Sequence, residues 1–317
     1  MTSAAAGRSD LDGVLLLNKP RGLSSQQTVS RVKWLLQAKK AGHTGTLDPM
    51  ADGLLPLGFG EATKFTRFLL DADKCYLATL RLGISTTTGD AEGDPVGQSP
   101  VTASREQIES ILKPFLGQQT QIPPMHAAIK IDGKPLYAYA RSGESVDRKP
   151  RNIFINKIEL IDYKDNFLTI WVSCSKGTYI RVLAEDIGKA LGCGAHLTAL
   201  TRERAGVLTL SSAISIAELE DLDLQRRREK LLPVDTFAAE LPRLDLDAEP
   251  ARRLLMGQEV LLPTSGLTGL LRLYGGIDGF LGVGEACGNR LHARRLLASA
   301  AMVVSGQKNL SNLRVKE

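Results

Sequence analysis

The sequence predicts an α+β fold with two domains. Segments with the pattern of strands are mixed irregularly with separate amphipathic helices, and they lack the regular strand–helix–strand rhythm that is typical of a doubly wound sheet. The chain has 317 residues, which is more than one hydrophobic core usually holds. Short apolar segments separated by glycine-bearing turns dominate the C-terminal part, and this pattern predicts a second, smaller β module.

The first elements are a buried strand and a capped helix. Residues 14–17 form a short apolar run that ends in an Asn-Lys-Pro-Arg-Gly turn. Ser24, with Gln27 three residues later, predicts a capping box, and apolar residues at helical spacing then predict a helix over residues 25–39. Residues 41–60 are rich in glycine and proline, so we expect them to be largely loop.

The middle of the chain predicts strands around two further helices. Residues 78–82 alternate between apolar and polar side chains, the period of a half-buried strand, and residues 104–116 have the pattern of a capped helix. Residues 153–162 and 167–174 are rich in β-branched and aromatic side chains and predict a hairpin. Residues 179–191 have a helical pattern that a glycine closes.

We place a domain boundary near residues 241 and 242, after a highly charged stretch. The expected domains are then residues 10–240 and residues 241–304, followed by a disordered polar tail over residues 305–317.

Composition favours a polyanionic partner and argues against a metal centre or a membrane span. Lys and Arg number 40 against 35 acidic residues, a net charge of +5, and basic side chains on phosphates release counterions. The cysteines form no C-x-x-C pair and the histidines no H-x-x-x-H, so we expect reduced core cysteines and no metal. Apolar runs are too short to cross a membrane, and the N-terminal residues do not resemble a secretory signal, so we expect a cytoplasmic protein. The basic clusters are Lys39-Lys40, Arg148-Lys149-Arg151, Arg202 with Arg204, Arg226-Arg227-Arg228 and Arg294-Arg295.

The loop around Asp48 predicts a projecting carboxylate. It reads Gly-His-Thr-Gly-Thr-Leu-Asp-Pro over residues 42–49. The two glycines permit backbone conformations that are closed to other residues, and Pro49 pushes Asp48 away from the helical region. Taken alone, an aspartate before a proline most often only stabilises a turn.

The surrounding sequence resembles the bacterial tRNA pseudouridine-55 synthases, the TruB family. Because many independent segments match that family in order over residues 13–206, the chain is identified as a member of it. The matching segments are GVLLLNKPRGLSS at 13–25, GHTGTLDPMADGLLPLGFGEATK at 42–64, RLG at 81–83, TTTGDAEG at 86–93, GKPLY at 133–137, SKGTYIR at 175–181, and GCGAHL at 192–197 followed by Leu200 and Arg202.

This resemblance implies an enzyme that isomerises uridine 55 of the tRNA T loop to pseudouridine without an added cofactor. The family breaks the N1–C1′ bond, rotates the uracil and rejoins it through C5, after flipping the nucleotide out of its stack. Asp48 stands at the position of the nucleophile, and a carboxylate can form a covalent intermediate. Attack at C1′, attack at C6 and a glycal route stay open.

The resemblance also gives roles to other residues. Tyr76 stacks on the extruded uracil and serves in proton transfer, and Arg181 pairs with Asp48 to hold it ionised. Tyr179 and Leu200 wall the base pocket. Without the resemblance, Tyr76 would be interpreted as a half-buried strand residue and Arg181 as part of a surface ion pair. Tyr179 and Leu200 would be interpreted as core residues.

Substrate binding is assigned to a histidine and several lysines. His43 matches the histidine that helps the target base to leave its stack, and Lys19 matches the loop that supports the active site, which favours a structural role for it. Lys64, Lys130 and Lys134 are candidates for phosphate contact.

The resemblance implies a mixed, mostly antiparallel catalytic sheet with an inserted RNA clamp and a small C-terminal RNA-binding domain of PUA-like, barrel-like form. The insertion spans residues 122–151 and meets the T arm, while the C-terminal domain meets the acceptor end. Related sequences often have Tyr-Ser where this chain has His126-Ala127, a departure that removes two hydroxyls near the RNA clamp.

The sequence is also compatible, to different degrees, with three other functions. A guide-RNA-dependent synthase shares the catalytic loop, but the insertion favours the stand-alone bacterial type. A non-catalytic tRNA-binding or folding protein would not need Asp48, Tyr76 and Arg181 intact. A sugar-hydrolysing enzyme that uses Asp48 and Asp90 lacks support, because nothing in the sequence places the two carboxylates together. We expect a monomer with tRNA as its partner and no obligate protein partner.

Overall fold

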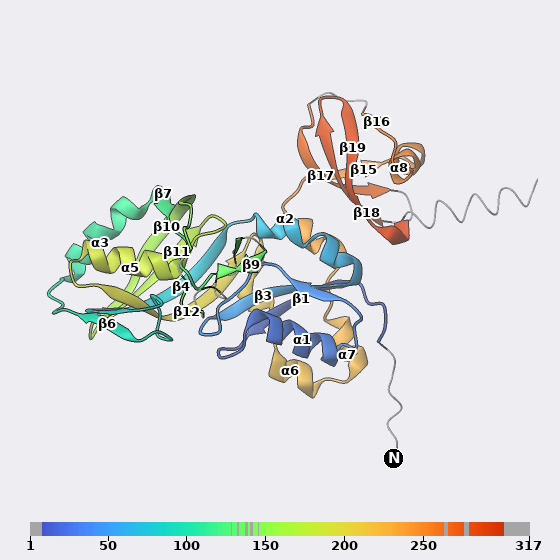
Figure 1. Cartoon of the computed structure of the whole chain (residues 1–317). Coiled ribbons are helices and arrows are strands. Elements are labelled where there is room, and N and C mark those ends of the chain that lie inside the picture. Colours follow the sequence, from blue (N-terminus) through green and yellow to red (C-terminus); the bar gives the residue numbers. More distant parts are fainter. Residues whose placement is uncertain are drawn as a thin grey trace, which may run out of the picture.

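The computed structural model describes residues 8–300, apart from residues 128, 132, 137–138, 140–141, 145, 263–265 and 276–278, and apart from the side chains of residues 130–131 and 134–135. Figure 1 shows a large twisted sheet with helices packed on it, and a smaller sheet that stands at one end. The α+β prediction, with a mixed and mostly antiparallel main sheet, is confirmed. The predicted tail over residues 305–317 lies outside the described residues.

The main sheet has ten strands in the order β14-β1-β3-β12-β4-β11-β10-β7, with β13 paired to β12 and β2 paired to β3. The pairs β1–β14 and β3–β12 are parallel, and the other pairs are antiparallel. The strands are β1 (Gly13–Lys19), β2 (Ala41–His43), β3 (Asp52–Phe59), β4 (Lys74–Leu82), β7 (Gly117–Gln121), β10 (Arg151–Lys164), β11 (Phe167–Cys174), β12 (Ala195–Ala205), β13 (Leu208–Thr209) and β14 (Ile214–Ser215).

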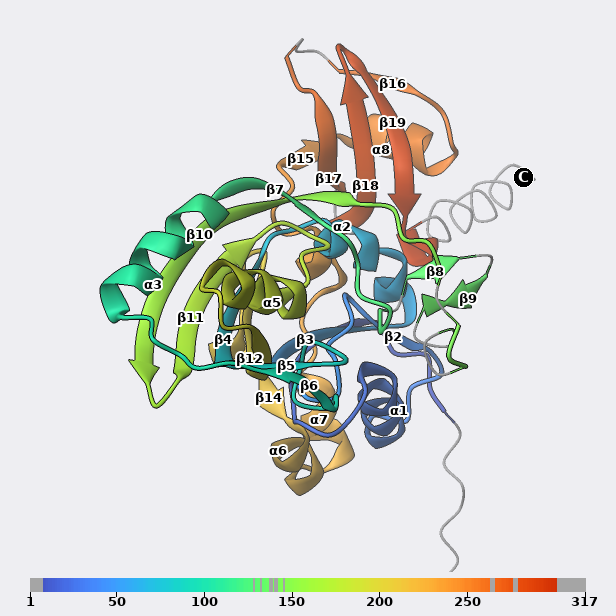
Figure 2. The same ribbon diagram turned by 60° about the vertical axis from the view of Figure 1, so that its left-hand side comes forward.

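Helices pack against the main sheet and connect its strands. Figure 2 shows α3 and α5 against one face of β10, β11 and β4, where Leu168, Ile170 and Val172 pack in the main hydrophobic core. The helices are α1 (Ser25–Leu35), α2 (Thr66–Leu70), α3 (Arg105–Leu112), α5 (Ile180–Ala190), α6 (Ile216–Asp221), α7 (Leu224–Glu229) and α8 (Ala248–Leu255), with 3₁₀ turns η1 (Gly60–Lys64), η2 (Lys113–Phe115), η3 (Leu210–Ser212) and η4 (Val234–Ala238).

The sequence explains α5, the helix that begins at the candidate site. Ile180, Leu183, Ala184 and Ile187 lie three or four residues apart, and all four are buried against the sheet. A Cβ on Gly188 would lie 2.2 Å from the amide nitrogen of Ala195, so a glycine is required where α5 meets β12. The predicted helix over residues 179–191 is confirmed.

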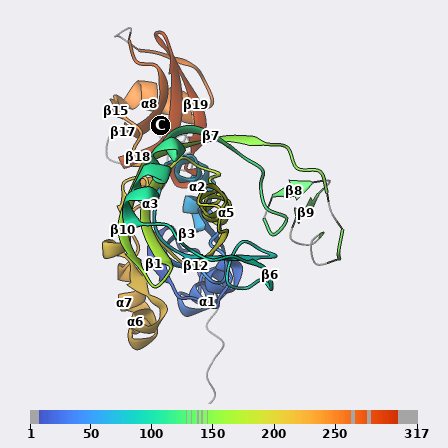
Figure 3. The same cartoon turned by 90° about the vertical axis from the view of Figure 1, so that its left-hand side faces the viewer.

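Two short antiparallel pairs lie outside the main sheet. They are β5 (Ile84–Thr86) with β6 (Pro95–Gln98), and β8 (Lys130–Ile131) with β9 (Lys134–Pro135). The second pair belongs to the predicted insertion, and Figure 3 shows it standing away from the body of the molecule.

Two local predictions were wrong. Residues 41–60 contain β2 and β3 rather than mainly loop, because Leu54, Leu55 and Leu57 are fully buried in the middle of the sheet despite the nearby glycines and proline. The first helix ends at Leu35, before the predicted residue 39, and Gln37 then turns with a φ of 53°. Its capping box of Ser24 and Gln27 is confirmed.

The C-terminal segment forms a five-stranded sheet in the order β15-β17-β18-β19-β16 around its own core. Its strands are β15 (Arg243–Leu246), β16 (Val260–Leu261), β17 (Gly269–Gly275), β18 (Gly279–Cys287) and β19 (Arg290–Leu296). The apolar segments that the sequence predicts as strands of this module, residues 259–262, 270–274, 280–284 and 292–297, correspond to β16, β17, β18 and β19. Strand β15 and helix α8 (Ala248–Leu255) were not predicted. Phe280 joins this sheet to the larger part, since its ring centroid lies 5.4 Å from that of Phe65 in α2's cap, and Arg272 Nε donates to the Leu241 carbonyl at 2.9 Å.

Three of the four cysteines are buried and free, as expected, but Cys287 is exposed. Within the described part of the chain, no helix is both long and apolar enough to cross a membrane.

Candidate active site

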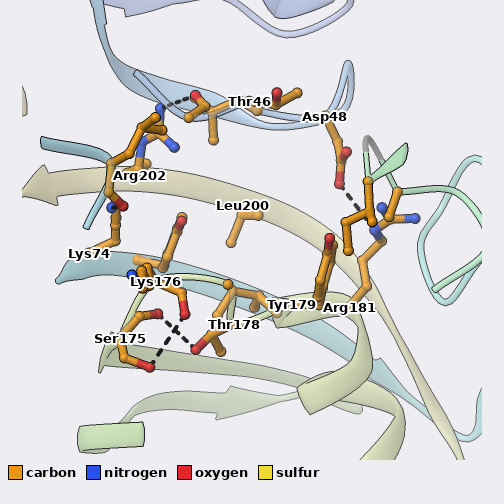
Figure 4. Close-up of a pocket in the computed structure, with 18 residues that line it drawn as sticks. Thr46, Asp48, Lys74, Ser175, Lys176, Thr178, Tyr179, Arg181, Leu200 and Arg202 are labelled. Carbon is orange, nitrogen blue, oxygen red and sulfur yellow. Dashed lines mark hydrogen bonds and ion pairs between the residues drawn. The ribbon is translucent and has the colours of Figure 1, made fainter. Parts of the chain in front are cut away.

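A cavity of about 330 Å³ opens between the loop after β2, the strands β4 and β12, and the start of α5. Figure 4 shows Asp48 and Arg181 at one end of it, Arg202 and Lys74 at the other, and Leu200 between them. The five residues that sequence analysis assigned to chemistry and to the base pocket all line this cavity, although they come from four separate elements. They are Asp48, Tyr76, Tyr179, Arg181 and Leu200.

The Asp48 loop is held by bonds to its backbone. Ser25, the first residue of α1, accepts from the amide of Leu47 at 2.8 Å and donates to its carbonyl at 2.9 Å. Lys19 is fully buried, and its Nζ donates to the Ala51 carbonyl at 2.6 Å. Gly45 adopts a φ of +84°, which favours glycine. These contacts place the Asp48 carboxylate in a defined position before any substrate arrives.

Arg181 carries the contacts that organise the site. Its Nε lies 3.1 Å from Oδ2 of Asp48, and its Nη1 lies 3.4 Å from Oδ2 of Asp90. Its Nη2 donates to the carbonyl of His126 at 2.9 Å, and Nη1 also donates to that of Thr88 at 3.4 Å. The Arg181 side chain is 5% exposed and that of Asp48 is 33% exposed. One buried guanidinium therefore holds a carboxylate that faces the cavity.

Asp90 is a second carboxylate on Arg181 that sequence analysis did not assign to the site. Its side chain is 3% exposed, and its Oδ1 accepts from the Thr88 hydroxyl at 2.5 Å and from the Glu92 amide at 3.1 Å. The structure thus does bring Asp48 and Asp90 to one arginine, contrary to our expectation. Asp90 does not line the cavity, however, so it is not placed to act on a sugar as a second catalytic carboxylate.

Burial and charge shift the pKa values of the groups in the cavity. Burial raises the pKa of Asp48, and Asp90 raises it further, while the guanidinium of Arg181 lowers it. Burial raises the pKa of Tyr76, and the neighbouring Arg202 acts in the opposite direction. The net effect is a raised pKa for Asp48, which the Arg181 guanidinium limits. The pKa of Tyr76 is also raised, so Tyr76 is a protonated phenol at neutral pH.

Arg202 and Lys74 line the cavity without having been predicted to do so. Arg202 is 2% exposed, and it donates from Nε to the Leu54 carbonyl at 2.7 Å and from Nη2 to the Gly45 carbonyl at 3.2 Å. Lys74 donates to three carbonyls at the end of α2, and burial lowers its pKa to about 8. The sequence signal for Arg202 was its place beside Leu200 in β12.

Two arginines of the basic cluster at residues 226–228 bond to the protein's own backbone. Arg227 donates to the carbonyls of Leu219, Glu220 and Leu35, and Arg228 donates to the Leu36 carbonyl, so both tie α7 to α1 and α6. Backbone carbonyls of the protein, rather than an external phosphate, bond these two side chains, while Nε of Arg228 is buried without a hydrogen-bond partner among the described residues.

The remaining predicted binding residues lie outside the cavity lining. His43 is in β2, its Nδ1 is buried without a hydrogen-bond partner among the described residues, and burial lowers its pKa. Lys19 points into the protein, and Lys64 pairs with Glu61 at 2.6 Å. The side chains of Lys130 and Lys134 lie outside the described part of the structure. The residues described include no group of three His, Cys, Asp or Glu side chains that could hold a metal ion.

Family models match the chain from its first helix to its last strand. The model described as TruB family pseudouridylate synthase, N terminal domain, matches residues 33–180. The tRNA pseudouridylate synthase B C-terminal domain matches residues 181–239, and the model described as pseudouridine synthase II TruB, C-terminal, matches residues 242–297.

Two curated relatives are each named tRNA pseudouridine synthase B. The protein from Aromatoleum aromaticum is 50% identical over 296 residues, which cover 93% of this chain and 95% of the relative. The protein from Thiobacillus denitrificans is 50% identical over 292 residues, which cover 92% and 98% respectively.

Solved structures share the fold. A chain in a crystal structure of a Cbf5-Nop10-Gar1 complex is 26% identical, with a TM-score of 0.69 over 87% of this chain and 79% of that one. A chain in the archaeal box H/ACA sRNP Nop10-Cbf5 complex has a TM-score of 0.67 at 24% identity, over 90% of this chain and 85% of that one.

Proposed function

The chain belongs to the TruB family of pseudouridylate synthases, and on this basis we propose that it isomerises uridine 55 in the T loop of tRNA, with Asp48 as the nucleophile. The activity of a tRNA pseudouridine synthase follows from the family. The observation that supports the residue assignment is the Asp48 carboxylate, which faces a cavity and is held by the buried guanidinium of Arg181.

The cavity supports a division of labour among its side chains. The extruded uracil enters between Tyr76 and Leu200, where the aromatic ring stacks on the base. Arg181 keeps Asp48 ionised in a site where burial alone would favour the neutral acid, so the carboxylate is ready to attack the flipped nucleotide. Tyr76 holds a proton inside the cavity and can donate it during the exchange of bonds.

The supporting residues act by position. Lys19 and Arg202 hold the two sides of the Asp48 loop by its carbonyls, so neither needs to touch the substrate. Burial lowers the pKa of His43, which sits in β2 just before that loop, where it can enter the space that the flipped base leaves. We assign Lys64 and Lys130 to phosphate contact.

The proposal extends to the rest of the chain. Residues 10–240 form the catalytic domain, the insertion over residues 122–151 clamps the T arm, and the PUA-like domain over residues 241–304 meets the acceptor end. The projecting β8–β9 pair and the basic strand β19 support this arrangement. We propose that the protein acts as a monomer in the cytoplasm, where tRNA is found, without an obligate protein partner.

Sequence identity decides between the alternatives. The relatives named tRNA pseudouridine synthase B are 50% identical to this chain, whereas the chain from the Cbf5-Nop10-Gar1 complex is 26% identical. The paired Asp48 and Arg181 argue against a protein that only binds or folds tRNA.

The test compares the wild type with Asp48→Asn on an unmodified tRNA transcript, with pseudouridine mapped by carbodiimide-based primer extension. The wild type should give one stop in the T loop, the variant should give none, and both should bind tRNA. A wild type that binds tRNA and leaves the T loop unmodified would refute the enzyme assignment in favour of a folding role.

A further inference from the structure

Gln121 ties the insertion to the candidate active site. It is the last residue of β7, directly before the insertion, and is 4% exposed. Its side-chain Nε2 donates to the carbonyl of Tyr179 at 3.3 Å, and its Oε1 accepts from the amide nitrogen of Tyr179 at 2.9 Å. One buried amide thereby bonds both backbone groups of a residue that lines the cavity, and the Tyr179 carbonyl also accepts from the Leu183 amide within α5 at 3.1 Å.

The residue held in this way sets the geometry of the site. Tyr179 is the N-cap residue of α5, and no side chain of its own caps the helix. Arg181 follows two residues later in the first turn of α5, and it carries the ion pair with Asp48. The backbone of Tyr179 therefore fixes both where its ring stands and the direction in which the Arg181 side chain leaves the helix.

The same insertion makes a second contact with the site. Nη2 of Arg181 donates to the carbonyl of His126, five residues after Gln121. The returning end of the insertion begins β10 at Arg151, which is the strand partner of Gln121. Both ends of the insertion thus meet at Gln121, beside the residues that hold the nucleophile.

We propose that Gln121 is a positioning residue of the isomerisation, which holds Tyr179 and Arg181 in place relative to Asp48; this inference rests on the proposed function. A displacement of about 1 Å near a reacting group can cost about 100-fold in rate. Loss of the clamp should therefore lower kcat by about 10- to 100-fold while KM for tRNA changes by less than about 3-fold. A glutamine that merely anchored an edge strand would lower stability without this separation of kcat from KM.

The experiment uses two substitutions and a matched control in the full-length protein. Gln121→Met keeps the length of the side chain and removes both hydrogen bonds. Gln121→Glu keeps the acceptor for the Tyr179 amide but sets a carboxylate oxygen against the Tyr179 carbonyl. Gln118→Met is the control, because Gln118 lies in the same strand with an exposed side chain. Steady-state kinetics on an unmodified tRNA transcript and urea unfolding are measured for all of them.

Lowering the pH should restore the activity of Gln121→Glu, because protonation of the glutamate restores the lost hydrogen bond. A protonated glutamic acid can donate to the Tyr179 carbonyl and accept from the Tyr179 amide, as glutamine does. The rate of this variant relative to the wild type should therefore rise as the pH is lowered from about 8 to about 5.5.

Support requires a fall in kcat for Gln121→Met at nearly constant KM, kinetics like the wild type for Gln118→Met, and recovery of Gln121→Glu at low pH. Wild-type kcat in both Gln121 variants overturns the inference while the proposed function stands. Should Gln121→Met fail to fold, the rate ratio of Gln121→Glu decides alone, and a ratio that does not change with pH overturns the inference. A wild type without activity refutes the proposed function itself, before any variant is compared.

Discussion

Asparagine at position 90 should slow the reaction, although Asp90 does not line the cavity. Oδ2 of Asp90 lies 3.4 Å from Nη1 of Arg181, and the two side chains are 3% and 5% exposed. Asp90→Asn keeps the shape of the side chain but replaces an ion pair by a contact between a neutral amide and the guanidinium, which stays charged. A charged partner contributes about 1–2 kcal/mol more than a neutral one. This difference corresponds to a rate loss of about 5- to 30-fold if it is felt in the transition state.

The same substitution should shift the pH dependence in a definite direction. The negative charge of Asp90 raises the pKa of Asp48, and its removal should lower that pKa. The acidic limb of kcat/KM should therefore move to lower pH. If Asp90 acted only through the ionisation of Asp48, the variant would be as fast as the wild type or faster at acidic pH. A slower enzyme with an acid-shifted limb isolates the orientation of Arg181 as the effect.

The assay is single-turnover conversion of an unmodified tRNA transcript across the pH range. Asp94→Asn is the control, since Asp94 is an exposed aspartate in the same loop. The reasoning fails if Asp90→Asn reacts within about twofold of the control, or if its acidic limb moves to higher pH.

Three further predictions concern stability and tRNA binding. Gly53 has a φ of +98°, and a Cβ there would lie 2.4 Å from the Arg202 carbonyl oxygen. Gly53→Ala should therefore lower the free energy of unfolding by more than the backbone strain alone, which costs about 1–3 kcal/mol. Gly22 has a φ of +85° and open space around it, so Gly22→Ala should show only the backbone strain in the same urea titration. Phe280→Ala removes a ring whose centroid lies 5.4 Å from that of Phe65, and it should weaken docking of the C-terminal sheet by about 1 kcal/mol. Limited proteolysis should become faster and tRNA affinity should fall. An unchanged cleavage rate would contradict a docking role for Phe280. The folded-state pKa of Lys74 is about 8, below the ordinary lysine value of 10.5. The unfolded chain therefore binds more protons between these two pH values, and the contribution of Lys74 to stability rises with pH there. The stability deficit of Lys74→Met relative to the wild type should widen over that range, and a deficit that narrows would refute the lowered pKa.

The sequence predicted the parts of the fold that local pattern controls. The capping box of Ser24 and Gln27 and the helix over residues 179–191 follow from side-chain spacing, which depends on neighbouring residues alone. Strand β3 was missed because its burial comes from β1 and β12, which lie far away in the chain. Glycine and proline in that segment favoured a loop until those partners were known.

Some residues of the candidate site could be predicted from the sequence, whereas their contacts with distant segments could not. The resemblance to a family placed Asp48, Tyr76 and Arg181, and the structure brings them to one cavity. It could not show Asp90 on Arg181 or Gln121 on Tyr179, because both contacts join segments separated by more than fifty residues. The sequence analysis counted Arg202 only as part of a basic cluster, because an arginine looks the same in sequence whether it faces water or a backbone carbonyl.

The position of β12 in the main sheet has a consequence for biosynthesis. This strand comes late in the chain but lies between β3 and β4, and it pairs with both. While the ribosome is still making residues 83–194, β3 and β4 have no shared partner and expose unpaired backbone edges. The Asp48 loop, which precedes β3, and the Tyr76 strand β4 can therefore reach their final arrangement only after β12 has emerged. Pairing of segments so far apart in the chain is also slow. A pause or truncation before residue 205 should leave a chain that is inactive and prone to aggregation.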